Sequence, residues 1–149
     1  MDNQEDIVAL SEHLIQGTRY EHLWVAEALD RRLIPAKPEV PMPWDYLATR
    51  LDTLDTLKIQ VKGTKTPLAM DGCSNSTRFQ ITAKTGSKKL QMVDSRVVDI
   101  LACYVEPYKV WYNFPMTALS GKSVWLYPHN NSSKGQYEIW RHDWSAYAA

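Results

Sequence analysis

In the stretch Lys58-Ile59-Gln60-Val61-Lys62, polar and apolar side chains alternate with a period of two. Such alternation is typical of a half-buried β-strand, whose successive side chains point to opposite faces of a sheet. Ile59 and Val61 are therefore predicted to face a core, and Lys58, Gln60 and Lys62 to face the other way. On its own, the polar face could equally be a solvated surface without a further role.

An acidic residue is expected to lie beside this strand. Residues 44–51 and 54–63 are predicted to form an antiparallel pair that turns at Asp52-Thr53. Asp45 stands near the start of the first strand, so the pairing would bring its carboxylate next to Gln60 and Lys62. The alternative is that Asp45 is a surface residue at the start of a strand.

A second acidic residue, Glu21, lies on a predicted helix among Trp24, Val25 and Ala28, which share one helical face. A carboxylate in such an apolar stripe is desolvated unless a cation or a lysine compensates it. The alternative is a structural role, because Thr18 and Glu21 have the spacing of a helix capping box.

Two carboxylates, an amide and a lysine suit the hydrolysis of a phosphodiester bond by a metal-dependent mechanism. Mg²⁺ prefers oxygen ligands, polarises a phosphate and lowers the pKa of an attacking water. The predicted catalytic residues are Glu21, Asp45, Gln60 and Lys62. The predicted metal ligands are the side chains of Asp45, Glu21 and Gln60 with the backbone carbonyl of Val61, and Mn²⁺ is a candidate substitute for Mg²⁺.

These residues resemble the motifs of the PD-(D/E)XK nuclease superfamily, and in particular its group I intron-associated homing endonuclease branch. The matching segments are Gly17-x-x-x-Glu21-x-x-Trp24-Val25-Ala26-x-x-Leu29, Pro43-Trp44-Asp45, Ile59-Gln60-Val61-Lys62-Gly63-Thr64, and the downstream strands at 98–104, 110–115 and 123–126. Two departures stand out: Trp44 is inserted between the proline and the aspartate, and Gln60 replaces the second acidic residue. Asp99 matches a downstream position, and a structural hydrogen bond is favoured for it over metal ligation.

The resemblance spans about residues 17–128 and implies a fold, an activity and an assembly. The fold is a three-layer, restriction-endonuclease-like α/β (α+β) domain with a central mixed sheet flanked by helices. The activity is Mg²⁺-dependent, site-specific cleavage of double-stranded DNA. The assembly is a homodimer or homotetramer, because one active site of this size cuts one strand.

The rest of the chain is interpreted as a single domain over residues 1–149. Helices are expected at 4–16, closed by Gly17, and at 18–33, followed by a Pro-rich extended connector at 35–43. Strands at 78–85 and 88–92 could pair through Gly86-Ser87 in a DNA-contacting hairpin within 66–92. A C-terminal extension at 129–149 is rich in aromatic residues, for which a place in the core or in a dimer interface is preferred.

Charge is unevenly distributed although the net charge is zero. Residues 1–57 hold five basic and eleven acidic side chains, whereas residues 58–90 hold seven basic side chains and one acidic. An electropositive segment of this kind is typical of a nucleic-acid-binding face, although a solvated lysine-rich hairpin would look the same. The predicted DNA-binding residues are Lys65, Arg78, Gln80, Lys84, Lys88 and Lys89.

Composition excludes several other classes of protein. The chain has 149 residues, of which 44% are hydrophobic, so a single core is expected. No apolar run reaches the roughly 20 residues of a membrane span, and the acidic N-terminus is unlike a signal peptide. Two cysteines far apart exclude a disulfide scaffold and a cysteine zinc site. A cytoplasmic protein of a bacterium or a phage-infected cell is expected, with no membrane partner.

Three rival functions remain open. The same fold would serve a Holliday-junction resolvase or a restriction-type nuclease. Gln60 is also compatible with a non-catalytic DNA-binding module on a decayed nuclease fold. The last rival is a structural protein with a solvated lysine face, which would show no salt-dependent affinity for DNA.

Overall fold

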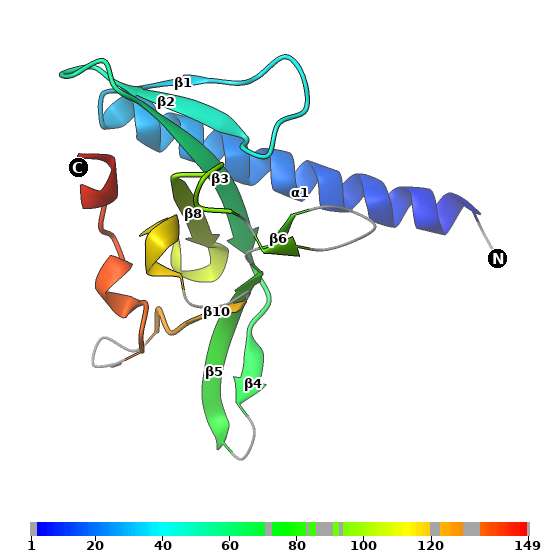
Figure 1. Cartoon of the computed structure of the whole chain (residues 1–149). Helices are drawn as coiled ribbons and strands as arrows, with labels where there is room; N and C mark the ends of the chain where they lie inside the picture. The colour runs from blue at the N-terminus through cyan, green and yellow to red at the C-terminus, as the bar shows by residue number, and fades with distance from the viewer. Residues whose placement is uncertain are drawn as a thin grey trace.

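The computed structural model describes residues 3–70, 73–82, 84–85, 91–92, 94–119, 123–129 and 135–148. Strands dominate these ranges, and one long helix precedes them (Figure 1). In chain order the elements are α1 (Asn3–Asp30), β1 (Leu33–Ala36), β2 (Tyr46–Arg50), β3 (Thr56–Thr64), β4 (Leu68–Met70), β5 (Cys73–Thr82), β6 (Lys84–Thr85), β7 (Gln91–Met92), β8 (Ile100–Val105), η1 (Glu106–Tyr108), β9 (Val110–Pro115), η2 (Met116–Ala118), β10 (Ser123–Leu126), η3 (Glu138–Trp140) and η4 (Ser145–Tyr147).

The central sheet has five strands in the order β1-β2-β3-β8-β9. β3 pairs in parallel with β8, and the other three pairs are antiparallel, so the sheet is mixed. The predicted antiparallel pair of residues 44–51 and 54–63 is confirmed, with Tyr46 opposite Ile59. The strand bearing Gln60 thus occupies the middle of the sheet.

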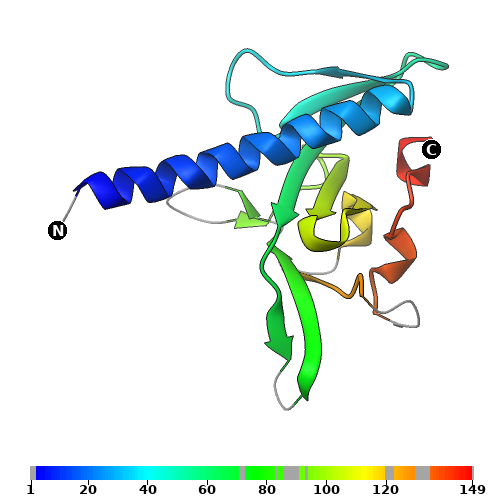
Figure 2. The same ribbon diagram turned by 180° about the vertical axis from the view of Figure 1, so that it is seen from behind.

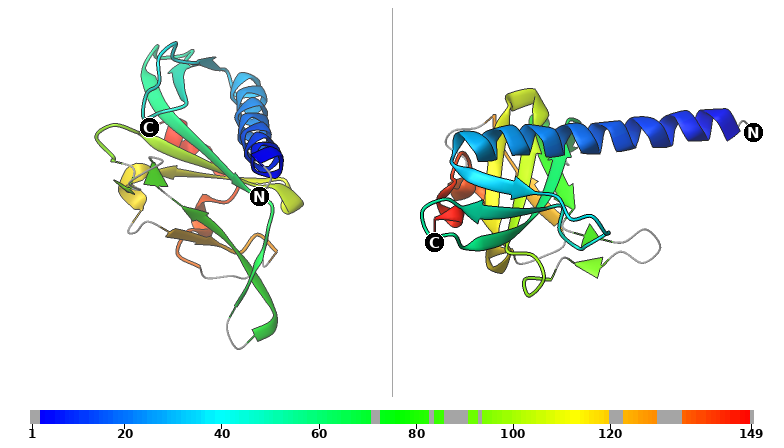
Figure 3. Two further views of the ribbon diagram at one scale, coloured as in Figure 1. Left: turned by 90° about the vertical axis from the view of Figure 1, so that its right-hand side faces the viewer. Right: turned by 90° about the horizontal axis from the view of Figure 1, so that it is seen from above.

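Two hydrophobic clusters lie on opposite faces of this sheet. On one face, Tyr20, Trp24 and Ala28 of α1 pack in a cluster with Ile59 and Val61 of β3, as the alternation of the strand predicts. On the other face, a second sheet of order β10-β5-β4 supplies the covering layer. Figure 3 (left) shows the central sheet lying between the helix and this second sheet.

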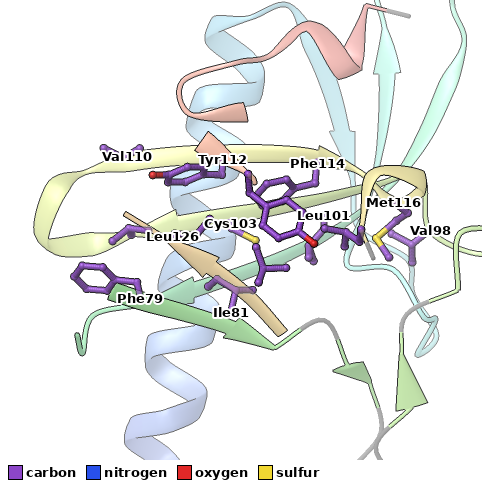
Figure 4. Close-up of a cluster of buried hydrophobic side chains, with 14 residues drawn as sticks. Phe79, Ile81, Val98, Leu101, Cys103, Val110, Tyr112, Phe114, Met116 and Leu126 are labelled. Atoms are coloured by element: carbon purple, nitrogen blue, oxygen red, sulfur yellow. The ribbon is translucent and has the colours of Figure 1, made fainter. Parts of the chain in front are cut away.

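The second cluster is built from β8 and β9 on the central sheet and from β5 and β10 on the small sheet. Figure 4 shows side chains from all four strands meeting there, among them Leu101, Phe114, Ile81 and Leu126. The mixed α+β, layered fold class is therefore confirmed. Where helices were expected on both faces, the second face is covered by a sheet, because Phe79 and Ile81 alternate with polar residues along β5 and need a flat apolar partner.

The predicted break of the first helix at Gly17 is wrong. α1 runs without interruption from Asn3 to Asp30, so Thr18 is not an N-cap and Glu21 closes no capping box. Gln16, Arg19 and Tyr20, on either side of the glycine, all bind the Glu106 carboxylate. These contacts require continuous helical geometry across residue 17, and they override the cost of a helical glycine, about 1 kcal/mol.

The Pro-rich segment contains a short strand that the sequence did not predict. β1 pairs antiparallel with β2, and Pro35 lies opposite Ala48. β1 is at the edge of the sheet, where a residue without an N–H is tolerated because no further strand needs the donor. Residues 37–45 then form the expected connector.

The hairpin predicted from residues 78–85 and 88–92 is replaced by a different pairing. β5 ends at Thr82 and pairs with β4 on one side and β10 on the other. Among the described residues of this stretch, 84–85 pair with 91–92, and the predicted turn Gly86-Ser87 lies outside the described residues. The β4–β5 hairpin projects from the body, and the N-terminal half of α1 extends away from it in another direction (Figure 2).

The aromatic extension belongs to the core, as preferred. Tyr147 is buried, accepts a hydrogen bond from Trp24 Nε1 at 3.0 Å and donates one to Asn113 Oδ1 at 2.7 Å. Trp140 and Trp144 are partly buried against the two clusters. None of the helices described here is long and apolar enough to cross a membrane.

Candidate active site

Asp45 is fixed directly onto the central strand that carries the Gln-Val-Lys motif. Its backbone N–H donates to the Ile59 carbonyl at 2.8 Å, and its Oδ2 accepts a hydrogen bond from the Val61 N–H at 2.7 Å. Val61 is flanked by Gln60 and Lys62 on β3. The predicted proximity of Asp45 to this motif is therefore present in the structure.

Gln60 is buried, with 6% of its surface exposed, and does not lie on a solvated strand face. Within the described part of the chain, its Oε1 has no hydrogen-bond partner. A buried amide oxygen left without a donor is costly, by about 1–3 kcal/mol. An oxygen-seeking cation at this position would remove that cost.

Glu21 reaches the same region from α1. Its side chain is 17% exposed, and its Oε2 lies 3.4 Å from Nζ of Lys37, which comes from the connector before β2. A lysine was expected to compensate the Glu21 carboxylate on the apolar face of the helix. That lysine is Lys37, which the sequence analysis did not single out. The signal for Lys37 was weak, since a single lysine between Pro35 and Pro38 matches no motif.

Electrostatics couple these groups. Burial raises the pKa of the Asp45 carboxyl, and the nearby Glu21 carboxylate raises it further. The Val61 hydrogen bond and the charges of Lys62 and Lys37 act in the opposite direction. A buried carboxylate whose ionisation is also disfavoured by a neighbouring carboxylate belongs to a site in which a divalent cation is stabilising.

All four predicted catalytic residues line one cleft with a volume of about 620 Å³. The cleft lies where α1, β3 and β5 come together, and Val61 and Gly63 also line it. Gly63 is required there because a Cβ at this position would overlap the ring of Tyr20. Sequence analysis missed Tyr20 and Gly63 as a packing pair, although Gly63 follows the motif directly.

The predicted DNA-binding residues are only partly gathered at the cleft. Lys65 and Gln80 line it, and Arg78 lies two residues from Gln80 on the same strand. Lys84 belongs to β6, but its side chain is outside the described part of the structure, as are residues Lys88 and Lys89.

Asp99 has the structural role that was favoured for it. Its Oδ2 accepts a hydrogen bond from the Lys58 N–H at 2.8 Å, and its N–H donates to the Lys58 carbonyl at 2.9 Å. The residue ties the start of β3 to the segment that leads into β8.

No protein-family model and no curated protein sequence matches the chain. The structure of a bacterial homing endonuclease, I-Ssp6803I, is similar with a TM-score of 0.69 and 16% sequence identity, over 87% of this chain and 88% of that chain. Hjc, a Holliday junction resolvase from the archaeal hyperthermophile Archaeoglobus fulgidus, is similar with a TM-score of 0.51 and 17% identity, over 89% of this chain and 95% of that chain. The chain has the fold of the PD-(D/E)XK nucleases. At these identities the likeness establishes the fold, and the activity has to be argued from the residues of the site.

The donors of this PD-(D/E)XK fold fit a hard divalent cation. In the described residues, no group of three or more His, Cys, Asp or Glu side chains is placed to hold a metal. The cleft instead brings together two carboxylates, from Glu21 and Asp45, and the unpartnered Oε1 of Gln60. Such an all-oxygen set suits Mg²⁺ or Mn²⁺, which keep several waters in place of further protein ligands.

Proposed function

We propose that the chain is a Mg²⁺-dependent, site-specific endonuclease of double-stranded DNA, of the homing endonuclease type. The observation that carries the proposal is the convergence of Glu21, Asp45, Gln60 and Lys62 on one cleft, with Asp45 hydrogen-bonded to the strand that bears the other two motif residues. The likeness to a homing endonuclease structure supports the same reaction class.

The cation would be held by the side chains of Glu21, Asp45 and Gln60 and by the backbone carbonyl of Val61. Mn²⁺ could replace Mg²⁺ at this site. When bound, the ion would lower the pKa of the attacking water and neutralise charge on the scissile phosphate. Gln60 contributes a neutral oxygen, so the site carries one negative charge fewer than a site with two motif acids. We therefore infer a weaker affinity for the ion than a fully acidic motif would give.

Lys62 is the proposed partner of the reacting groups. It lies on the same strand as Gln60, lines the cleft and lowers the pKa of Asp45 through its charge. Its ammonium would orient the attacking water or stabilise the negative charge that develops on the phosphate. The ammonium of Lys37 lies beside the Glu21 carboxylate. A bound cation would lie next to the same carboxylate.

DNA is proposed to approach along the wall formed by β3 and β5. Lys65 and Gln80 at the cleft and Arg78 on β5 would contact it. Lys84, Lys88 and Lys89 stay predicted DNA-binding residues from the sequence. One cleft cuts one strand, so cleavage of a duplex calls for a homodimer or a homotetramer whose symmetry matches that of the target.

A second candidate is the resolution of four-way DNA junctions. The observation that favours it is the likeness to an archaeal Holliday junction resolvase over 89% of this chain. A panel of four-way junctions and linear duplexes of the same sequences separates the two activities, because a resolvase cuts the junction and spares its arms.

The decisive experiment compares wild type with Lys62→Ala and Asp45→Ala on a randomised duplex library and on the junction panel, with Mg²⁺ and with Mn²⁺. We expect cleavage by wild type and loss of cleavage in both variants. Lys58→Ala is the matched control, since it removes the same side chain from the same face of β3, outside the cleft. Undiminished cleavage by Lys62→Ala would refute the assignment, and tight DNA binding without cleavage by wild type would identify a non-catalytic DNA-binding module.

A further inference from the structure

The outward face of the small sheet forms a polar platform beside the cleft. Phe79 and Ile81 of β5 are buried with 2% exposure each, so Arg78 and Gln80, which alternate with them, point outward. On β10, Val124 and Leu126 are fully buried, so Ser123 and Trp125 share the outward face. These four side chains are neighbours because β10 and β5 pair with Trp125 opposite Gln80.

The platform is continuous with the proposed active site. Gln80, Ile81 and Thr82 line the cleft, and Gln80 is held by a 3.0 Å hydrogen bond from its Nε2 to Ser123 Oγ. Arg78 lies two residues further along β5, about 7 Å away at the rise of an extended strand. That is the length of about two nucleotide steps of a DNA strand.

The guanidinium of Arg78 lies over an aromatic ring. Its Cζ is 3.6 Å from the centroid of the Trp125 ring, and in the described structure its buried Nε has no hydrogen-bond partner. A ring this close restricts the movement of the guanidinium, whose N–H groups all lie in its own plane. A guanidinium fixed in this way loses little freedom when it makes two parallel hydrogen bonds.

We propose that Arg78 reads a guanine in the major groove and that Trp125 is the positioning residue that makes this contact specific. Arginine donates to both O6 and N7 of guanine, and no other base offers that pair of acceptors. This inference rests on the DNA binding of the proposed function. It adds a residue, Trp125, that matched no binding motif, and it assigns the base that Arg78 recognises.

The test is a binding selection from randomised duplexes with Lys62→Ala protein, which separates recognition from cleavage. We expect guanine to be enriched at one position of the site. Arg78→Ala removes both donors, so the enrichment should fall by about 5- to 150-fold at that position alone. Arg78→Lys keeps the charge but not the planar pair of N–H donors, so it should reduce the enrichment at the same position by a smaller factor. Trp125→Ala should reduce the same enrichment, and Trp125→Phe should retain part of it.

Arg31→Lys is the matched control, because Arg31 also stacks on a tryptophan, Trp144, at 4.2 Å, but lines a different cleft. It should leave the base preference unchanged. A uniform loss of affinity for all sequences in Arg78→Ala, with a shallower salt dependence, would mean a phosphate contact and would overturn the base assignment. An unchanged preference in Trp125→Ala would overturn the positioning role, provided that its melting temperature matches wild type.

The outcomes also separate this inference from the proposed function. Selective binding by a wild-type protein that cuts no DNA would leave the Arg78–Trp125 assignment standing and overturn only the hydrolysis. Absence of any binding to DNA would overturn both. If Trp125→Ala does not fold, Trp125→Phe and Arg78→Lys still decide the matter, since both keep the packing of the platform.

Discussion

The carboxylate of Asp45 and the backbone of Val61 are joined by a 2.7 Å hydrogen bond, and this bond links the connector before β2 to the middle of the central sheet. It aligns the Asp45 side chain with the strand that carries Gln60 and Lys62. The carboxylate is also largely withdrawn from water, which raises its pKa. Placement and charge can therefore be tested separately.

Asp45→Asn should abolish cleavage while leaving the fold intact. An asparagine oxygen can accept the same Val61 hydrogen bond, but the charge that attracts a cation is gone. We expect the cleavage rate to fall by about 100-fold or more, at least as much as the loss of an outer-shell partner of a metal site can cost. Because the raised pKa means that ionised Asp45 destabilises the native state, the melting temperature at pH 7 should equal or exceed that of wild type. A variant that melts early would show that Asp45 acts mainly in folding.

Divalent cations should stabilise the wild-type protein. A ligand that binds only the native state at 100 times its Kd adds about 2.7 kcal/mol to the free energy of unfolding. Mg²⁺ or Ca²⁺ should therefore raise the melting temperature of wild type and of Lys58→Ala, but not of Asp45→Asn. The shift should shrink as the pH falls through the raised pKa of Asp45, because protons then compete with the ion. Equal shifts in all three proteins would place the binding outside this cleft.

Gln60 offers a test in two directions. Gln60→Leu removes the unpartnered oxygen in a similar volume, so the metal-free protein should gain about 1 kcal/mol or more of stability, while the melting shift with Mg²⁺ is lost. Gln60→Glu should do the opposite, lowering stability without metal and reducing the Mg²⁺ concentration needed for half-maximal cleavage. A Gln60→Leu protein that keeps its Mg²⁺ response would exclude this oxygen as a ligand.

The sequence predicted those parts of the site that local patterns encode. The alternation at 58–62 placed β3, and the short connection around Asp52-Thr53 placed Asp45 beside it, because strand register follows from side-chain period and turn length. It could not place Lys37, since the bond to Glu21 depends on how a Pro-rich connector crosses the end of the sheet. Tertiary contacts of this kind leave no periodic signal.

The errors in the fold have the same cause. Gly17 and Thr18 have the local chemistry of a helix end, but side chains on both sides of them bind Glu106, 86 or more residues away in sequence. Likewise, the partner of β5 is β10 as well as β4, and a pairing between strands so distant is set by the shared core and not by a turn. Long-range contacts overrode local propensity at both places.

Glu106 should make the stability of the protein sensitive to acid. Hydrogen bonds from Arg19, Tyr20 and Gln16 lower its pKa from 4.5 to about 2. A depressed carboxyl pKa adds stability that is complete above pH 4.5 and is lost as the pH falls from 4.5 towards 2. Urea unfolding followed between pH 6 and pH 2.5 should show this loss in wild type. Glu106→Gln should be less stable than wild type at pH 6, and its free energy of unfolding should change less between pH 6 and pH 2.5. If the free energy of unfolding fell in parallel in the two proteins, the acid sensitivity would belong to other carboxylates.

Gly63→Ala should destabilise the protein through Tyr20. A Cβ at residue 63 would overlap the Tyr20 ring, which is itself held by Glu106, so the ring cannot simply move aside. Overpacking of this kind costs about 1–3 kcal/mol, which for a chain of this size corresponds to a fall in melting temperature of about 2–12 °C. Tyr20→Leu loses the hydrogen bond but opens the space, so adding Gly63→Ala to it should cost much less than in wild type. If the losses of stability from Gly63→Ala and Tyr20→Leu simply added in a double-mutant cycle, the two residues would not be coupled. The Tyr20 ring would then not explain the glycine at position 63.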